Sequence, residues 1–143
     1  MALILFLEYH CAFRQAAAYL LNREPDLEVV AQASSVAEGR ERMAEGRVDS
    51  AIVDVPLPDG GACEFVKELR EADPPVPVLV LTHLEGREEH GRYLASGASE
   101  VLSKEASYAE VLAAARRLGR RARKRARAGA LRPRSTQESI LSE

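Results

Sequence analysis

The sequence predicts one α/β domain in which five parallel strands form a single sheet with helices on both faces. Short apolar runs alternate along the chain with segments whose apolar residues recur at helical spacing. The runs are rich in Val, Leu and Ile, which is typical of parallel strands that are buried on both faces. A length of 143 residues fits one domain. Parallel strands joined through helices give a doubly wound sheet with right-handed crossovers.

The five predicted strands are the short apolar runs themselves. They cover residues 3–7, 27–31, 50–55, 77–81 and 101–103. Because each strand is followed by a helical pattern, the chain reads as a series of βα units, and this favours a parallel sheet over an antiparallel one.

The helices are predicted from apolar spacing and from signals at their ends. Two capping boxes, Ser35 with Glu38 and Ser107 with Glu110, mark helix starts, and Gly97 marks a helix end. The predicted helices cover residues 12–21, 36–44, 62–69, 88–96 and 108–118.

Three polar residues close or follow the last three predicted strands: Asp54, Thr82 and Lys104. The carboxyl ends of parallel strands share one edge of the sheet, where open α/β sheets bind ligands, so these side chains should converge. An Asp can accept a phosphoryl group, a hydroxyl can hydrogen-bond it, and an ammonium can offset its charge. An Asp before a turn often serves only as a cap. The presence of Thr82 and Lys104 at the neighbouring strand ends favours a reactive Asp54 instead.

The formal net charge of -2 hides an uneven distribution. Residues 1–115 contain 20 acids and 10 bases, whereas residues 116–134 contain 10 bases and no acid. An acidic domain therefore carries a basic C-terminal segment. Cys11 and Cys63 form no CxxC pair and have no His at metal-ligand spacing, so neither a disulfide scaffold nor a zinc site is expected.

The end of the last helix can be read in two ways. Leu118, Ala122 and Ala126 continue its apolar stripe, but Gly119 is unfavourable inside a helix and common just beyond a helix end. We expect a domain over residues 1–118 and a basic, disordered tail over residues 119–143. No apolar run is long enough to span a bilayer, and we expect a cytoplasmic protein without membrane contact.

Residues 3 to about 118 resemble the receiver domain of two-component response regulators, which has a flavodoxin-like fold. The matching order is a strand ending in an acid, then Asp54, Thr82 and Lys104 at spacings of 28 and 22 residues. The local motifs that carry the resemblance are Glu8-Tyr9-His10, Leu57-Pro58-Asp59-Gly60 and Gly97-Ala98-Ser99. The second and fourth strand segments are most similar to receivers that precede a LuxR-type helix-turn-helix, but we expect no such output domain within residues 119–143.

The resemblance implies a role for each matching residue. Asp54 would be the phosphoacceptor, Thr82 the switch hydroxyl and Lys104 the cation that pairs with the phosphoryl group. Glu8, Asp54 and the backbone carbonyl of Pro56 would hold Mg²⁺.

Two positions depart from the pattern of the resembled family. Tyr9 stands where a second acid usually ligates the metal, and a phenol is a poor ligand for a hard divalent cation, so Mg²⁺ binding should be weak. Val101 stands at a switch position that is usually aromatic, which weakens the expected coupling from Thr82.

Three functions from different classes follow. The first is a phosphorelay receiver that accepts a phosphoryl group at Asp54, with no substrate turnover. The second is a degenerate receiver that acts as a protein-binding module without phosphorylation. The third is a DNA-associated regulator that acts through the basic tail. The implied partners are a sensor histidine kinase or another signalling protein, with a homodimer as a further option and nucleic acid only weak and non-specific.

Overall fold

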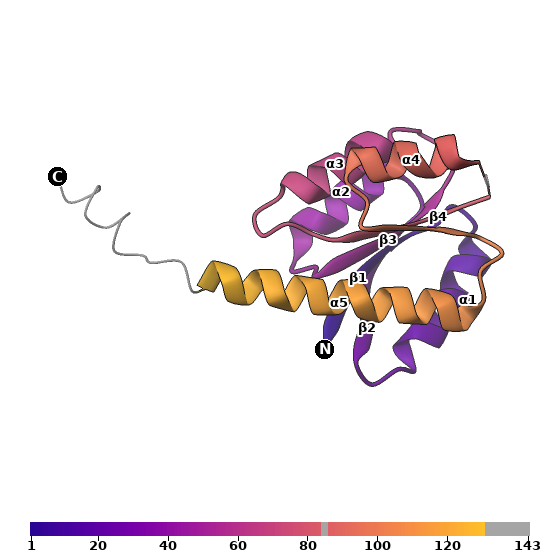
Figure 1. Cartoon of the computed structure of the whole chain (residues 1–143). Helices are drawn as coiled ribbons and strands as arrows, with labels where there is room; N and C mark the ends of the chain where they lie inside the picture. The colour runs from indigo at the N-terminus through magenta and orange to yellow at the C-terminus, as the bar shows by residue number, and fades with distance from the viewer. Residues whose placement is uncertain (84–85, 131–143) are drawn as a thin grey trace.

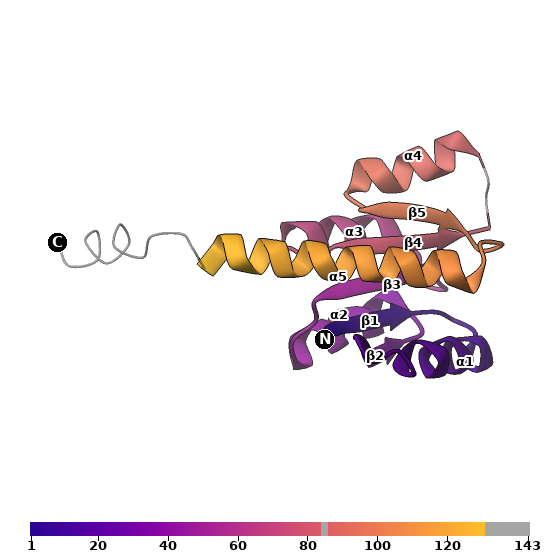
Figure 2. The same cartoon turned by 60° about the horizontal axis from the view of Figure 1, so that its bottom comes forward.

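A computed structural model describes residues 1–83 and 86–130 of the chain. Five parallel strands form one sheet in the order β2-β1-β3-β4-β5. The strands are β1 (Ala2–Leu7), β2 (Leu27–Ala33), β3 (Ser50–Val55), β4 (Val78–Thr82) and β5 (Glu100–Ser103). Figure 2 shows them in this order, from β5 beside α4 (Arg87–Ser96) to β2 beside α1 (Cys11–Asn22). The predicted parallel sheet is confirmed.

Five helices cover the two faces of the sheet. They are α1, α2 (Val36–Glu45), α3 (Ala62–Glu71), α4 and α5 (Tyr108–Ala130). The helices α2, α3 and α4 pack on one face, and α1 and α5 pack on the other (Figure 1). The domain therefore has the three layers that the alternating sequence pattern predicts.

The central strand β3 is buried along its whole length, and its side chains alternate between the two helical layers. Ala51, Val53 and Val55 belong to the core under α2, α3 and α4, whereas Ile52 belongs to the core under α1 and α5. Asp54 has the same parity as Ile52, so it lies on the side of the sheet that α1 and α5 cover.

Both predicted capping boxes are present. The Ser35 hydroxyl accepts a hydrogen bond from the Glu38 backbone N–H at 3.1 Å, and the Ser107 hydroxyl accepts one from the Glu110 backbone N–H at 3.2 Å. The second box is reciprocal, because the Glu110 carboxylate accepts from the Ser107 N–H at 3.2 Å. Asp59 adds a long-range cap to α2: its carboxylate accepts from the N–H groups of residues 36 and 37.

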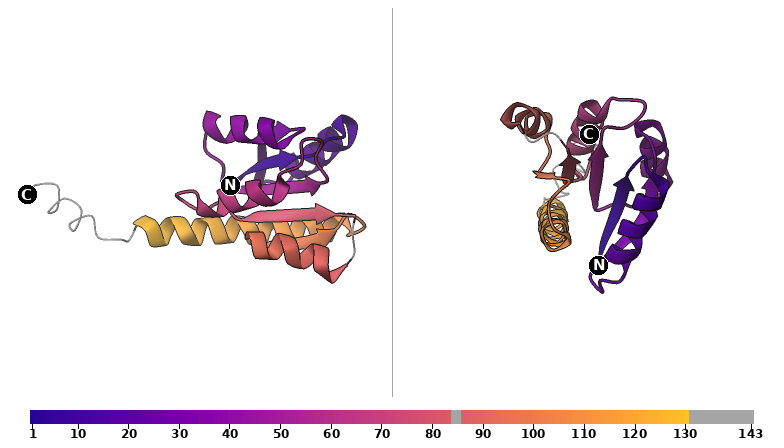
Figure 3. Two further views of the ribbon diagram at one scale, coloured as in Figure 1. Left: turned by 90° about the horizontal axis from the view of Figure 1, so that it is seen from above. Right: turned by 90° about the vertical axis from the view of Figure 1, so that its right-hand side faces the viewer.

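The last helix corrects the prediction that the chain is disordered after Leu118. The helix α5 continues through Gly119 to Ala130, and its last turns project beyond the sheet (Figure 3). Gly119 is buried, and a Cβ atom added there would lie 2.9 Å from the Cβ of Ala2. The glycine is therefore explained by close packing of the helix on β1 and not by helix termination. The predicted disorder is wrong for residues 119–130, and residues 131–143 lie outside the described part of the chain.

None of the helices in the described part of the chain is long and apolar enough to cross a membrane.

Candidate functional site

The carboxyl edge of the sheet brings the three predicted residues together. Asp54 lies opposite Leu81 in the register of β3 and β4, and Thr82 lies opposite Ser103 in the register of β4 and β5. Lys104 follows β5 directly, and its backbone N–H donates to the Thr82 carbonyl at 3.0 Å. One backbone hydrogen bond thus ties the Lys104 position to the strand that carries Thr82.

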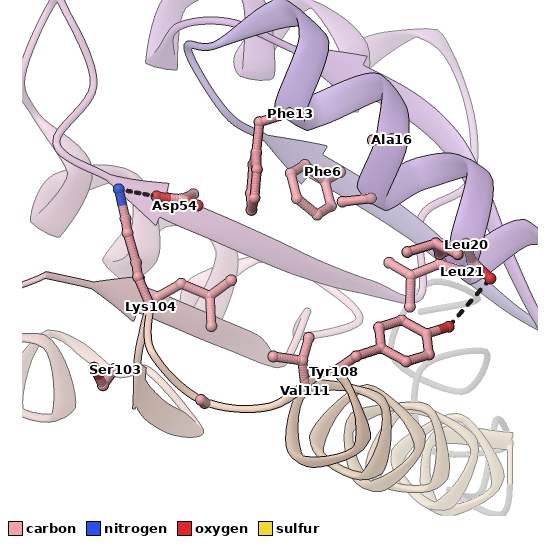
Figure 4. Close-up of a pocket in the computed structure, with 13 residues that line it drawn as sticks. Phe6, Phe13, Ala16, Leu20, Leu21, Asp54, Ser103, Lys104, Tyr108 and Val111 are labelled. Atoms are coloured by element: carbon pink, nitrogen blue, oxygen red, sulfur yellow. Dashed lines mark hydrogen bonds and ion pairs between the residues drawn. The ribbon is translucent and has the colours of Figure 1, made fainter.

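Asp54 and Lys104 form an ion pair (Figure 4). The Asp54 side chain is 2% exposed and the Lys104 side chain is 16% exposed, so the pair is largely removed from water. Thr82 is also buried. A buried carboxylate, a hydroxyl and an ammonium therefore lie at adjacent strand ends, as the sequence predicts.

Glu8 adds a second buried carboxyl group to this edge. It follows β1, it is 3% exposed, and its backbone N–H donates to the Ala33 carbonyl at 2.9 Å. Its carboxylate accepts from the His10 N–H at 3.0 Å, and its carbonyl accepts from the Arg14 guanidinium at 2.8 Å. These contacts hold the Glu8 side chain at the inside of the loop that leads into α1.

The pKa of Asp54 is raised to about 8, first by burial and then by a hydrogen bond with the Glu8 carboxyl group. The Lys104 ammonium opposes both effects. The Glu8 carboxyl group thus favours the protonated form of Asp54, and part of the Asp54 population carries a proton near neutral pH.

A hollow of about 420 Å³ opens this site to solvent. Its walls include Glu8, Tyr9, Pro56, His83 and Lys104. The Tyr9 side chain is 55% exposed, and its ring is tilted at 55° to the His10 ring with centroids 5.5 Å apart. Tyr9 therefore lies at the mouth of the hollow and not among the buried carboxyl groups.

The residues present give a small oxygen set for a divalent cation. Glu8 and Asp54 are carboxylates, and Pro56 lines the same hollow as Glu8. Among the described residues, no cluster of three or more His, Cys, Asp and Glu is placed to hold a metal ion. Since Mg²⁺ is often bound through one or two carboxylates and several waters, the chemistry of this set suits Mg²⁺ with fewer protein ligands than a three-acid site.

Two features of the site have no counterpart in the sequence predictions. Asp59, named above only as part of a sequence motif, caps α2, and the N–H groups of Ala37 and Val36 lower the pKa of its carboxyl group. A separate apolar cavity also reaches Asp54 and Lys104 from between α1 and α5. The only sequence signal for the cavity is a cluster of small residues beside aromatic ones.

The predicted switch position Val101 packs half-buried against the core under α2, α3 and α4.

Comparison with known proteins identifies the family. The model of the response regulator receiver domain matches residues 4–116. The DNA-binding transcriptional activator DevR/DosR of Mycobacterium tuberculosis is 32% identical over 119 residues, which are 83% of this chain and 55% of that protein. The oxygen regulatory protein NreC of Staphylococcus epidermidis is 28% identical over 79% of this chain and 52% of its own length. The chain thus spans about half the length of these relatives.

Solved structures give the same result. A LuxR-family two-component response regulator from Aurantimonas sp. SI85-9A1 has a TM-score of 0.76 and 26% identity, with 82% of this chain and 84% of that chain covered. A CheY-like receiver domain protein from Methanospirillum hungatei has a TM-score of 0.77 at 20% identity, with 87% and 98% covered, which supports the flavodoxin-like fold. This chain belongs to the family of response regulator receiver domains of two-component systems.

Proposed function

We propose that this chain is a phosphorelay receiver in which Asp54 accepts a phosphoryl group and in which the reaction depends on an unusually weak Mg²⁺ site. The observation that supports this most is the buried ion pair between Asp54 and Lys104 beside Thr82. Receiver domains are signalling modules, and we expect no substrate turnover beyond the phosphorylation and dephosphorylation of the chain itself.

The proposed transfer uses the ionised form of Asp54. A carboxylate oxygen attacks the phosphorus of the donor while the bond from phosphorus to the donor atom breaks, and the donor keeps the electron pair of that bond. Lys104 pairs with the phosphoryl oxygens, and the Thr82 hydroxyl donates to one of them. Mg²⁺, held by Glu8, Asp54 and the Pro56 carbonyl, would neutralise charge that develops on the phosphoryl group.

Weak metal binding is proposed because, among the described residues, only two carboxyl groups are buried at the site. Tyr9 is exposed at the mouth of the hollow and offers no carboxylate to the cation. A titration of the whole chain with Mg²⁺ and then with beryllofluoride tests the proposal, followed by NMR or by tyrosine fluorescence, since the chain has no Trp. We expect NMR shifts at Asp54, Thr82 and Lys104. They should require Mg²⁺ concentrations well above those at which ordinary receivers bind the ion.

The same titration separates this function from the degenerate receiver. A receiver that acts only as a protein-binding module would show no response to beryllofluoride at any Mg²⁺ concentration. In either case the proposed partner is a sensor histidine kinase or another signalling protein in the cytoplasm, with a homodimer as the alternative.

A nucleic-acid role has one supporting observation, which is the helical form of residues 119–130. Arg116 and Arg117 are ion-paired with Asp26 and Glu100 of the domain. The later bases are exposed on the projecting turns, with no ion pair to another described residue: Arg120, Arg121, Arg123, Lys124, Arg125 and Arg127. A basic helix suits phosphate contacts, so we propose weak binding to nucleic acid without sequence preference.

A further inference from the structure

Lys104, the cation of the buried ion pair, is reached from two sides. The hollow that contains Glu8 and Tyr9 opens it to solvent, and a second cavity of about 290 Å³ reaches it from between α1, α5 and the sheet. Figure 4 shows the ion pair at one end of this second cavity and Tyr108 with Leu20 at the other end. Lys104 lines both spaces, so an occupant of either one lies beside the same side chain.

The second cavity exists because small residues line it where α1 and α5 approach the sheet. Ala16 and Ala17 of α1 and Ala106 before α5 fill little volume. The Tyr108 hydroxyl donates to the Leu20 carbonyl at 3.1 Å, which joins the start of α5 to the end of α1. The cavity thus lies on the face of the sheet that α1 and α5 cover. The Tyr108–Leu20 hydrogen bond bounds it at one end, and the Asp54–Lys104 ion pair bounds it at the other.

The walls of the cavity are aromatic and aliphatic, and they are unusually open to water. Phe13 is 56% exposed, Leu20 is 43% exposed and Tyr108 is 41% exposed, whereas Phe6 at the floor is 2% exposed. Exposed aromatic rings around an apolar hollow are typical of ligand-binding clefts. The volume is at the lower end of the roughly 300–1,000 Å³ of such clefts, which suits one small ring system and excludes a long chain.

Asp54 and Lys104 are the only charged side chains among the described residues that line the cavity. An apolar pocket with a single accessible ammonium at its end complements a molecule with an apolar body and an anionic group. A carboxylate from a ligand in this cavity would compete with Asp54 for the Lys104 ammonium.

We propose that this pocket binds a small aromatic carboxylic acid, with its ring between Phe6, Phe13 and Tyr108 and its carboxylate on Lys104. Because the phosphoryl group on Asp54 would need the same ammonium, ligand binding and phosphorylation exclude each other. The pocket would give the receiver a chemical input that is separate from a kinase. The binding itself does not require Asp54 to be phosphorylated, so it stands or falls independently of the proposed phosphorelay function.

The test uses 2-naphthoate as the probe and its uncharged analogue 2-naphthamide as the matched control. Both are titrated into the whole chain by isothermal calorimetry and by NMR. We expect 2-naphthoate to bind at least tenfold more tightly than the amide, with shifts centred on Phe13, Ala106 and Tyr108. Binding of the acid should compete with beryllofluoride. Equal affinity for the two probes, or shifts confined to another face, would overturn the proposal.

Two substitutions on neighbouring residues of α1 test the location. Ala16 lines the cavity and Gln15 does not, and both are exposed. Ala16→Phe should abolish binding of 2-naphthoate, whereas Gln15→Phe should leave it unchanged. Lys104→Met should reduce the affinity for 2-naphthoate to that for the amide. Unchanged binding in both Ala16→Phe and Lys104→Met would refute the site. A stable dimer that covers α1 and α5 and prevents binding would also refute it.

Discussion

Lys104 pairs with a carboxyl group of Asp54 that the surrounding structure otherwise keeps neutral. The Asp54 side chain is 2% exposed, and Glu8, 3% exposed, adds a second carboxyl group to the same buried edge. One ammonium thus pairs with Asp54 beside a second buried acid. Protonation of Asp54 near neutral pH links the stability of the fold, the reactivity of the site and the occupancy of Lys104.

The first prediction is that stability falls with rising pH through Asp54. The pKa of Asp54 is about 8 in the folded chain and near its ordinary value of 3.8 in the unfolded chain, so between these values the folded state binds more protons. The free energy of unfolding must then decrease as pH rises through this window. Relative to Asp54→Asn, the wild type should lose about 1–3 kcal/mol between pH 5 and pH 8.

Urea unfolding at pH 5 and pH 8, followed by circular dichroism, measures this difference. The other ionisable side chains are the same in both proteins, so their contributions cancel in the comparison. Equal pH dependence of the two proteins would show that Asp54 is ionised across the range.

The second prediction concerns the metal. Tyr9→Asp should tighten Mg²⁺ binding by about tenfold or more, because it adds a carboxylate at the mouth of the hollow. Tyr19→Asp is the matched control, since Tyr19 is 65% exposed on α1 and does not line the hollow. Mg²⁺ titration by NMR gives both affinities. The prediction fails if the wild type binds Mg²⁺ at millimolar concentration or below, Tyr9→Asp does not change this affinity, and Glu8→Ala abolishes it. Glu8 would then replace the carboxylate that is missing at residue 9.

The third prediction places phosphorylation at Asp54 alone. A small phosphodonor should add one phosphoryl group that is stable in acid and labile in base, detected by mass spectrometry of the intact chain. Asp54→Asn should remove the modification, whereas Asp59→Asn should keep it, since Asp59 caps α2 and its carboxylate is occupied by two backbone N–H groups. A modification that persists in Asp54→Asn would place the site elsewhere.

The fourth prediction concerns the close packing of α5 on β1. Gly119→Ala should destabilise the fold by about 1–3 kcal/mol, because the new Cβ would lie 2.9 Å from the Cβ of Ala2 and this outweighs the gain in helix propensity. Gly129→Ala in the same helix meets nothing within 4 Å and should be neutral or stabilising. Thermal unfolding of the two variants distinguishes packing from propensity, and equal effects would contradict the packing argument.

The sequence predicts the sheet, its helical layers and the convergence of Asp54, Thr82 and Lys104, because strand period and strand ends are local signals with a fixed consequence in a parallel sheet. It fails at Gly119, because a glycine that ends a helix and one that allows close packing look alike without the partner strand. It also misses the cavity, since Ala16 and Ala106 leave space only in relation to Tyr108 and Leu20, which lie 88 residues apart.

The last prediction concerns the projecting part of α5. Six exposed bases between residues 120 and 127 have no acid among them and no aromatic residue to stack on bases, so any nucleic-acid contact should be to phosphates. We expect weak binding of duplex DNA without sequence preference, and binding that weakens steeply as salt is added because counterions are released. Arg121→Gln with Arg125→Gln should reduce the salt slope by about 2, whereas Arg23→Gln with Lys67→Gln, two exposed bases of the domain, should leave it unchanged. Fluorescence anisotropy at several salt concentrations measures both slopes. Salt-resistant, sequence-specific binding would favour a direct DNA regulator, because a single projecting helix that contacts only phosphates cannot read base edges.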